Sequence, residues 1–129
     1  MPEHERTRAW LVERLEDPSE LVGLAWQPLY AMVRVVSSRR IMGTDAVPLP
    51  AAWEAATTYL EQGNTHLVEP GPQHRPIASE LLETPGLHSA DVPDVHLAAL
   101  AIEHGLVLCS HDHGFARFQR LSWQDPLTA

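Results

Sequence analysis

Acidic and imidazole side chains stand at the ends of the two most apolar segments of the chain, and their types could support chemistry. Asp91 and Asp94 come just before the stretch LAALAI, while His111, Asp112 and His113 come just after the stretch LVLC. Two carboxylates that lie close together repel one another unless a cation lies between them. Oxygen ligands alone suit Mg²⁺ or Mn²⁺, whereas imidazoles are common ligands of zinc. The residue types therefore indicate a metal site, provided that the fold brings them together.

The elements around these residues predict that two of the acids meet. Residues 92–104 are typical of a helix that ends at Gly105, and LVLCS is typical of a buried strand. The helix runs back antiparallel to the strand, so its start and the strand's end lie at the same edge of the sheet. Ligands of open parallel sheets bind beyond the carboxyl ends of the strands. We therefore expect Asp94 and Asp112 to be neighbours, and they are the candidate catalytic and metal-binding residues.

Simpler structural roles compete with the metal site. Acidic residues at a helix start accept backbone N–H bonds and complement the helix dipole, which suits Asp91 at the N-cap and Asp94 in the first turn. The spacing of His111 and His113 is only a weak indication of zinc, so structural roles are expected for both. Cys109, inside an apolar run, is expected to be a buried packing residue rather than a nucleophile.

Length and composition favour one domain, residues 1–129, with a core of its own. The chain has 129 residues, of which 44% are hydrophobic, so disorder is not expected. Its single cysteine excludes a disulfide framework and favours a reducing compartment. No apolar run approaches the roughly 20 residues of a membrane span, and no signal peptide is visible. We therefore expect a cytoplasmic protein.

The charge balance argues against a broad nucleic-acid-binding surface. Seventeen acidic and nine basic residues give a formal net charge of −8. A DNA-binding module usually carries a basic face. An enzyme that handles a nucleic acid through a bound metal and a few local cations is still compatible with this charge, and so is a basic protein partner.

Helices and strands are predicted to alternate along the chain. Apolar strands connected by helices indicate an α/β fold with a parallel sheet that is covered on both faces. The rest is expected to be loop, including a tail after Ser110 with at most one helical turn. The predicted helices are 3–16, 27–42, 50–62, 77–84 and 92–104, and the predicted strands are 21–26, 65–70 and 106–110.

The segment VPDVHLAALAIEHGLVLCSHDHGFARF, with the closing LSWQDPL, resembles the C-terminal half of PIN-domain proteins. It is especially similar to the VapC toxins of bacterial VapBC toxin–antitoxin pairs. HERTRAWL, VGLAWQPLYAMVRVVSSRRIM and HLVEPGPQH resemble earlier segments of that family in the same order. The resemblance implies a PIN-like three-layer sandwich, in which helices flank a parallel sheet. It also implies a Mg²⁺- or Mn²⁺-dependent ribonuclease whose ions are held by three or four carboxylates.

The resemblance also assigns roles to residues and implies partners. Asp94 matches the family's acid at a helix start, and Asp112 matches the first acid of its loop, so both are implied to be catalytic metal ligands. The implied partners are an RNA substrate, a VapB-type antitoxin and a second copy in a homodimer. The cations expected to hold RNA are Arg34, Arg39, Arg40 and Arg117.

Three departures from the family pattern motivate an alternative function. The family's first strand, which carries an acid, has no counterpart before the segment HERTRAWL, so the chain is expected to be truncated or to start upstream of Met1 in the natural gene product. No carboxylate occurs in residues 27–41, and Gly114 stands where a second loop acid is frequent. The alternative is a catalytically impaired PIN-like protein that binds an antitoxin but does not cleave RNA. A PIN-like fold with an unrelated role is a further alternative.

Overall fold

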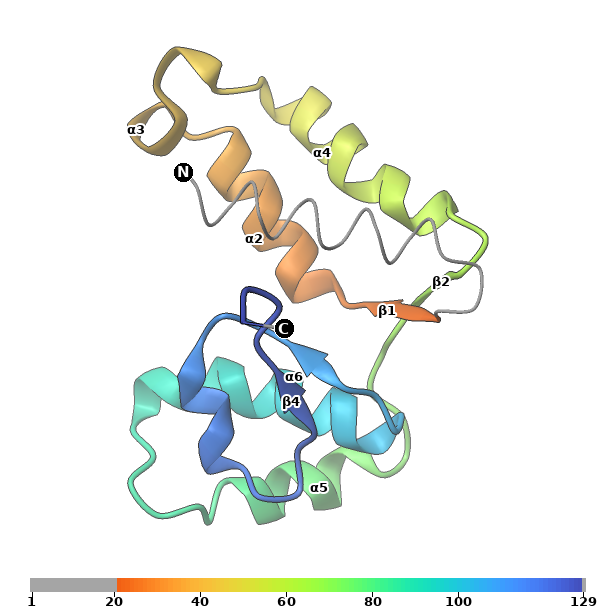
Figure 1. Cartoon of the computed structure of the whole chain (residues 1–129), viewed down its shortest axis with the longest axis vertical. Coiled ribbons are helices and arrows are strands. Elements are labelled where there is room, and N and C mark those ends of the chain that lie inside the picture. The colour runs from red at the N-terminus through yellow and green to blue at the C-terminus, as the bar shows by residue number, and fades with distance from the viewer. Residues whose placement is uncertain (1–20, 129) are drawn as a thin grey trace. The chain divides into compact units, whose positions relative to one another are not determined.

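The computed structural model describes residues 21–128, whose course is drawn in Figure 1. These residues belong to two compact units, 21–68 and 69–128, and each unit is described by itself. Among the described residues, each unit has helices and a two-stranded parallel sheet. The prediction of an α/β fold with parallel strands is therefore confirmed. The predicted helix at 3–16 lies outside the described residues, and the single domain stays a prediction.

In the unit 21–68, two helices pack side by side beside a short parallel sheet (Figure 1). Their shared core is formed by Leu29 and Val33 of one helix and by Ala52 and Ala56 of the other. Both alanines are almost fully buried, because their small side chains let the two helices approach closely. The elements are β1 (Val22–Leu24), α2 (Trp26–Val36), α3 (Arg39–Met42), η1 (Gly43–Asp45), α4 (Leu49–Thr58), η2 (Tyr59–Glu61) and β2 (Thr65–Leu67).

The helix predicted over 27–42 is divided into α2 and α3 by two serines. Ser37 donates its hydroxyl to the carbonyl of Val33 at 2.7 Å, and Ser38 accepts the backbone N–H of Ile41 at 3.3 Å as the N-cap of α3. Serine side chains that bond to nearby backbone compete with the helical hydrogen bonds. The prediction of one uninterrupted helix over 27–42 was therefore wrong, and the periodic apolar positions on which it rested end at Val36.

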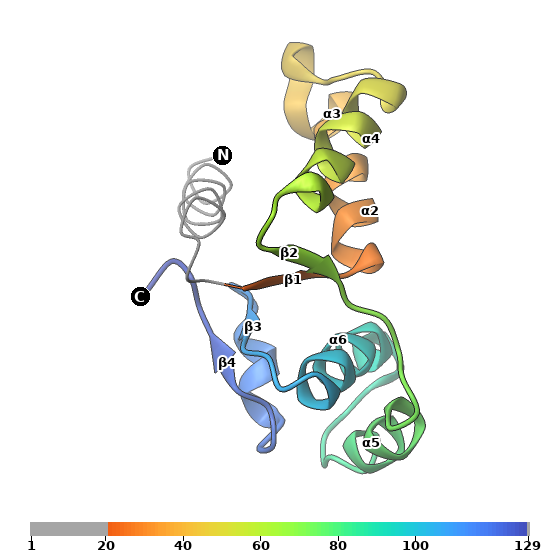
Figure 2. The same cartoon turned by 90° about the vertical axis from the view of Figure 1, so that its right-hand side faces the viewer.

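In the unit 69–128, helices α5 and α6 lie next to each other, and the sheet of β3 and β4 follows them along the chain (Figure 2). The two strands pair in parallel, with Leu108 opposite Trp123 and Cys109 opposite Gln124. The elements are α5 (His74–Leu81), η3 (Ser89–Asp91), α6 (Val92–Glu103), β3 (Leu108–Cys109), η4 (His113–Arg117) and β4 (Trp123–Gln124).

Helix α6 is the centre of the second core. Its Ala98 and Ala99 are fully buried, and they pack with α5 and with Phe115 and Phe118 from the segment after β3. The helix ends in a Schellman motif, in which Leu106 donates to the carbonyl of Ala101 at 2.9 Å. Gly105 supplies the left-handed residue of this motif at φ 66°. Within residues 21–128, no helix is long and apolar enough to cross a membrane.

The second unit differs from the sequence prediction at three places. Helix α5 begins at His74, three residues before the predicted start, because Pro76 fits within the first turn of a helix rather than before it. Strand β4 was not predicted at all. Strand β3 was predicted in a buried segment, yet Cys109 is exposed and Val107 is 54% exposed, so the buried role expected for Cys109 is wrong.

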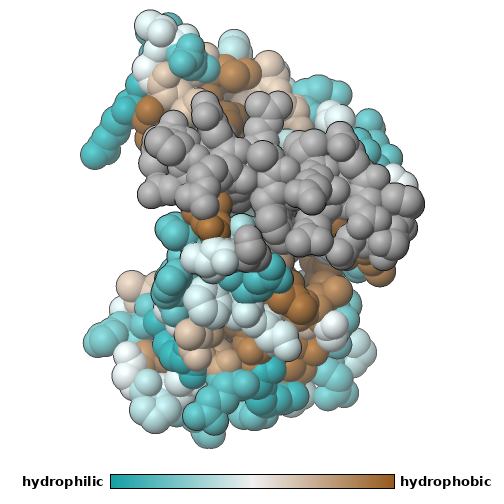
Figure 3. All heavy atoms as spheres, in the orientation of Figure 1, coloured by the Kyte–Doolittle hydropathy of each residue, from teal (hydrophilic) through white to brown (hydrophobic). Residues whose placement is uncertain are grey.

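Large apolar side chains of this unit also reach the surface at separate points. Figure 3 shows hydrophobic brown residues interrupted by hydrophilic teal ones on the face of residues 69–128 that is turned to the viewer. Leu82 and Val92 are each 52% exposed. Scattered apolar exposure of this kind is common in soluble domains. The exposed residues therefore do not by themselves indicate a docking surface.

Glu103, at the end of α6, connects this helix to the start of α5. Its two carboxylate oxygens accept the backbone N–H groups of Gly71 at 2.9 Å and of Gln73, the N-cap of α5, at 2.8 Å. The approach is close, since a Cβ on residue 71 would lie 2.6 Å from Oε2 of Glu103 and would displace this carboxylate. The hydrogen bond from Gly71, with that from Gln73, holds the pKa of Glu103 below its ordinary value.

A Glu103→Gln variant is expected to melt at a lower temperature than the parent protein at pH 7, because Gln replaces one charge-assisted acceptor by a donor. The lowered pKa makes the carboxylate stabilising above about pH 4.5, and this contribution is lost as the pH falls through the folded-state value. Thermal melts between pH 3 and 7 should therefore show that the melting temperatures of the parent protein and Glu103→Gln become more similar as the pH falls. Glu83→Gln, at an exposed residue, is the matched control, and an equal shift in both variants would contradict the assignment.

Candidate active site

Asp94 lies at the start of a helix and Asp112 lies just after a strand, as the sequence predicted. Asp94 lies in the first turn of α6. Asp112 follows β3 and is the N-cap of η4, where its Oδ1 accepts the backbone N–H of Gly114 at 2.9 Å. Both residues belong to the unit 69–128, so their proximity is a property of one compact body.

Arg117 lies among the acids and connects them. Its Nη2 donates to Oδ2 of Asp94 at 3.1 Å and lies 3.4 Å from Oδ1 of Asp91. A Cβ on Gly114 would lie 3.0 Å from Oδ1 of Asp112 and 3.1 Å from Nη1 of Arg117, so Asp112 and Arg117 flank this glycine. Two carboxylates, those of Asp94 and Asp91, thus pair with one guanidinium, and Asp112 lies on the far side of Gly114, an arrangement that stabilises positive charge at this point.

Both burial and nearby negative charge act on the carboxylate of Asp94. Partial burial raises the pKa of Asp94 above its ordinary value, and the charge of Asp112 raises it further. Arg117 acts in the opposite direction without cancelling the effect. The predicted neighbourhood of Asp94 and Asp112 is therefore present in the structure, while their role as catalytic metal ligands stays a prediction.

Asp91 has a different environment from Asp94. It is the N-cap of α6 by position, as expected, but its side chain accepts the backbone N–H of His88 at 2.9 Å rather than an N–H of α6. This backbone hydrogen bond lowers the pKa of Asp91. Asp91 thus contributes to the capping box of η3, and only its second oxygen faces Arg117.

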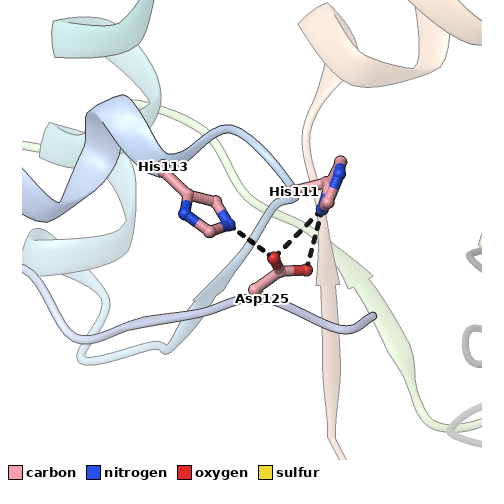
Figure 4. Close-up of side chains that lie close together, drawn as sticks. All are labelled: His111, His113 and Asp125. Carbon is pink, nitrogen blue, oxygen red and sulfur yellow. Dashed lines mark hydrogen bonds and ion pairs between the residues drawn. The ribbon is translucent and has the colours of Figure 1, made fainter. Parts of the chain in front are cut away.

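A second group of side chains with potential metal-ligand atoms consists of His111 and His113, which flank Asp112 along the chain, and of Asp125. Figure 4 shows the imidazoles of His111 and His113 turned toward the carboxylate of Asp125. Nδ1 of His111 lies 3.0 Å from Oδ2 of Asp125, and Nε2 of His113 lies 2.7 Å from the same oxygen. These three residues form a group that could hold a metal ion, because their ligand atoms all lie within 4.8 Å of one another.

Asp125 is buried, with 5% of its surface exposed, and within residues 21–128 no other charged residue is buried to this extent. Burial alone would raise its pKa, but the backbone N–H of Leu127 at 2.9 Å and the two histidines lower it below the ordinary value. His113 also packs edge-on against Trp123, with 5.2 Å between ring centroids. The group is therefore fixed from several sides.

The sequence reasoning missed Asp125 and the pairing of Arg117 with the acids. The signal for Asp125 was available in principle, because the rule that placed Asp112 beyond β3 also places Asp125 beyond β4. It was not used because β4 has only two residues and no distinctive pattern. Arg117 was considered only as an RNA-binding cation.

The sequence profile of the PIN domain family matches residues 3–121, so the chain belongs to this family. The resemblance inferred from the segment around α6 and β3 is thereby confirmed.

Within the family, the similar proteins are of the VapC type. Ribonuclease VapC33 of Mycobacterium tuberculosis is 38% identical over 128 residues, which cover 98% of this chain and 87% of the relative. VapC ribonuclease Mb2897 of Mycobacterium bovis is 36% identical over 117 residues, covering 91% and 79%. Ribonuclease VapC37 of Mycobacterium tuberculosis is 35% identical over 125 residues, covering 95% and 84%.

Proposed function

We propose that the chain is a metal-dependent endoribonuclease that hydrolyses RNA phosphodiester bonds as the toxin of a type II toxin–antitoxin pair. The observation that carries the proposal is the proximity of Asp94 and Asp112 in the unit 69–128, where the charge of Asp112 acts on Asp94 and Arg117 pairs with Asp94. The relatives described above are ribonucleases by name, which supports the same activity here. A VapB-type antitoxin as partner, a homodimer and a cytoplasmic location are parts of this proposal.

The carboxylates fit a hard divalent cation. Asp94 and Asp112 would hold Mg²⁺ or Mn²⁺, since both offer oxygen ligands. The pKa of Asp94 is raised by burial and, to a smaller extent, by the charge of Asp112, and a cation would relieve that second effect. A bound ion at this place would activate water and stabilise charge on the phosphate. Asp91 is a weaker candidate because one of its oxygens is committed to His88.

Arg117 is suited to contact the RNA backbone near these acids. Its Nε is buried and, within the described residues, has no hydrogen-bond acceptor. The side chain is 28% exposed, and its carbon Cζ lies 5.1 Å from the ring centroid of Phe118, which supports the guanidinium from one side. A guanidinium in this position can bind a phosphate oxygen while its other nitrogens pair with carboxylates.

An Arg117→Gln variant is expected to bind Mn²⁺ about 10-fold more tightly than the parent protein. The guanidinium competes with the ion for Asp94, so its removal leaves negative charge for the ion to neutralise. Titration calorimetry with Mn²⁺ measures the change.

Arg120→Gln is the matched control, because Arg120 carries the same charge but pairs with Glu80 at 2.7 Å, away from the acids. If both variants bind Mn²⁺ equally, Arg117 does not compete at a metal site. RNA binding should change in the opposite direction, being weaker in Arg117→Gln than in Arg120→Gln.

The function is tested with the purified chain and a mixed pool of structured and single-stranded RNAs. Cleavage is expected with Mg²⁺ or Mn²⁺ and should stop with EDTA, while a mock preparation from cells without the gene should be inactive. Parallel calorimetry reports whether Mn²⁺ binds. Metal binding without cleavage of any RNA in the pool would contradict the nuclease proposal.

The alternative function is a catalytically impaired PIN-like protein that binds an antitoxin but does not cleave RNA. It is favoured by the ion pair of Arg117 with Asp94, which offsets part of the negative charge that a metal ion would otherwise neutralise, and by the absence of a carboxylate in residues 27–41. A basic antitoxin segment would suit the net charge of −8. No Mn²⁺ binding at millimolar concentration, together with stable binding of the cognate antitoxin, would support this alternative.

A further inference from the structure

We propose that His111, His113 and Asp125 form a second metal site, which takes Zn²⁺ or a similar first-row transition ion and is separate from the site of Asp94 and Asp112. The inference rests on the side-chain geometry in Figure 4. Metal binding at these residues does not depend on the proposed nuclease activity, so the two proposals can fail independently.

The ligand atoms already converge on a common centre. Nδ1 of His111 and Nε2 of His113 lie 3.0 and 2.7 Å from Oδ2 of Asp125, and all three ligand atoms lie within 4.8 Å of one another. A tetrahedral ion with bonds of about 2.0–2.2 Å separates its ligand atoms by roughly 3.4 Å. Shifts of less than about 1 Å in exposed imidazoles would therefore suffice to admit the ion.

Neighbouring residues orient the three candidate ligands through hydrogen bonds and packing, as is common around metal sites. Asp125 is buried, and its Oδ1 accepts the backbone N–H of Leu127 at 2.9 Å, which orients the carboxylate. Trp123 packs against the ring of His113 and donates its indole N–H to the carbonyl of Ser110 at 2.9 Å. The histidine side chains are 54% and 65% exposed, so a solvent ligand can reach the fourth position.

The donor set selects the class of ion. Two imidazoles and one carboxylate suit Zn²⁺, Co²⁺ or Ni²⁺, whereas Mg²⁺ prefers oxygen ligands alone. The chain would thus carry two sites of different ligand chemistry, which meet in the loop after β3, where His111 and His113 stand on either side of Asp112. Because His111 and His113 both flank Asp112, an ion bound to them would fix the backbone on each side of that acid.

Titration of the untagged chain with Co²⁺, followed by its visible absorption, tests the proposal directly. The parent protein is expected to give the strong absorption of four-coordinate Co²⁺, and Zn²⁺ should displace it in a 1:1 ratio. His111→Gln and His113→Gln should each weaken Co²⁺ binding at least about 10-fold. Both substitutions are at exposed side chains, so the variants should still fold, which circular dichroism verifies.

Two control variants test whether Co²⁺ binds at these three residues rather than elsewhere in the chain. His66→Gln removes an exposed histidine from the other unit and should leave Co²⁺ binding unchanged. Asp94→Asn removes a carboxylate from the other metal site and should also retain the spectrum. The proposal is overturned if the parent gives no four-coordinate spectrum at millimolar Co²⁺, or if the spectrum survives His111→Gln and His113→Gln but is lost in Asp94→Asn.

Discussion

An Asp94→Asn variant is expected to cleave RNA at least about 100-fold more slowly than the parent protein in Mg²⁺ or Mn²⁺. The change keeps the size of the side chain and one oxygen, but it removes half of the negative charge that Asp94 and Asp112 offer to an ion. Folding should be preserved, because the raised pKa of Asp94 shows that the fold disfavours its charged form. Single-turnover cleavage at saturating RNA measures the effect on the chemical step.

Asp91→Asn is the matched control for this prediction. Asp91 also lies near Arg117 and precedes the same helix, but its side chain mainly accepts the N–H of His88, which the Asn oxygen can still accept. We expect a loss of less than about 5-fold for this variant. Equal rates for the parent and Asp94→Asn would exclude Asp94 as a metal ligand in catalysis, and equal losses in both variants would indicate a general charge effect.

A Phe118→Ala variant is expected to lower the free energy of unfolding by about 3–5 kcal/mol. Phe118 is 2% exposed and packs with Phe115, whose ring centroid is 6.5 Å away, and with the buried residues of α5 and α6. Its removal leaves a cavity that the surrounding helices can fill only in part. Urea denaturation followed by circular dichroism measures the loss, which would be a large share of the usual stability of about 5–15 kcal/mol.

Two further variants serve as controls for Phe118→Ala. Leu82→Ala, at a side chain that is 52% exposed, should change the free energy of unfolding by less than about 1 kcal/mol. Phe118→Leu keeps most of the buried volume but removes the ring that lies against Arg117. The free energy of Mn²⁺ binding should therefore change more than the free energy of unfolding. A loss of under about 1 kcal/mol in Phe118→Ala would show that this core is loosely packed.

The helical part of the second unit could be predicted from the sequence because its signals are local. Helix α6 has a long apolar run from Leu97 to Ile102, has Pro93 in its first turn and is followed by Gly105, and these features gave its bounds almost to the residue. The same local rules, with the known direction of a crossover, brought Asp94 and Asp112 to one edge.

The second ligand group could not be predicted because it depends on pairing between distant short segments. Strand β4 has two residues, and nothing in its own sequence distinguishes it from a loop. Only its parallel pairing with β3 places Asp125 beside His111 and His113. The exposure of Cys109 has a similar origin, since an apolar run does not reveal which of its faces another element will cover.

The pairing of β3 with β4 limits how far the chain can be shortened at its C-terminal end. The family profile matches residues 3–121, yet β4 and Asp125 lie after this match. An expression fragment cut at Leu121, the end of the profile match, would therefore keep Asp94 and Asp112 but lose the residue that pairs with both neighbours of Asp112.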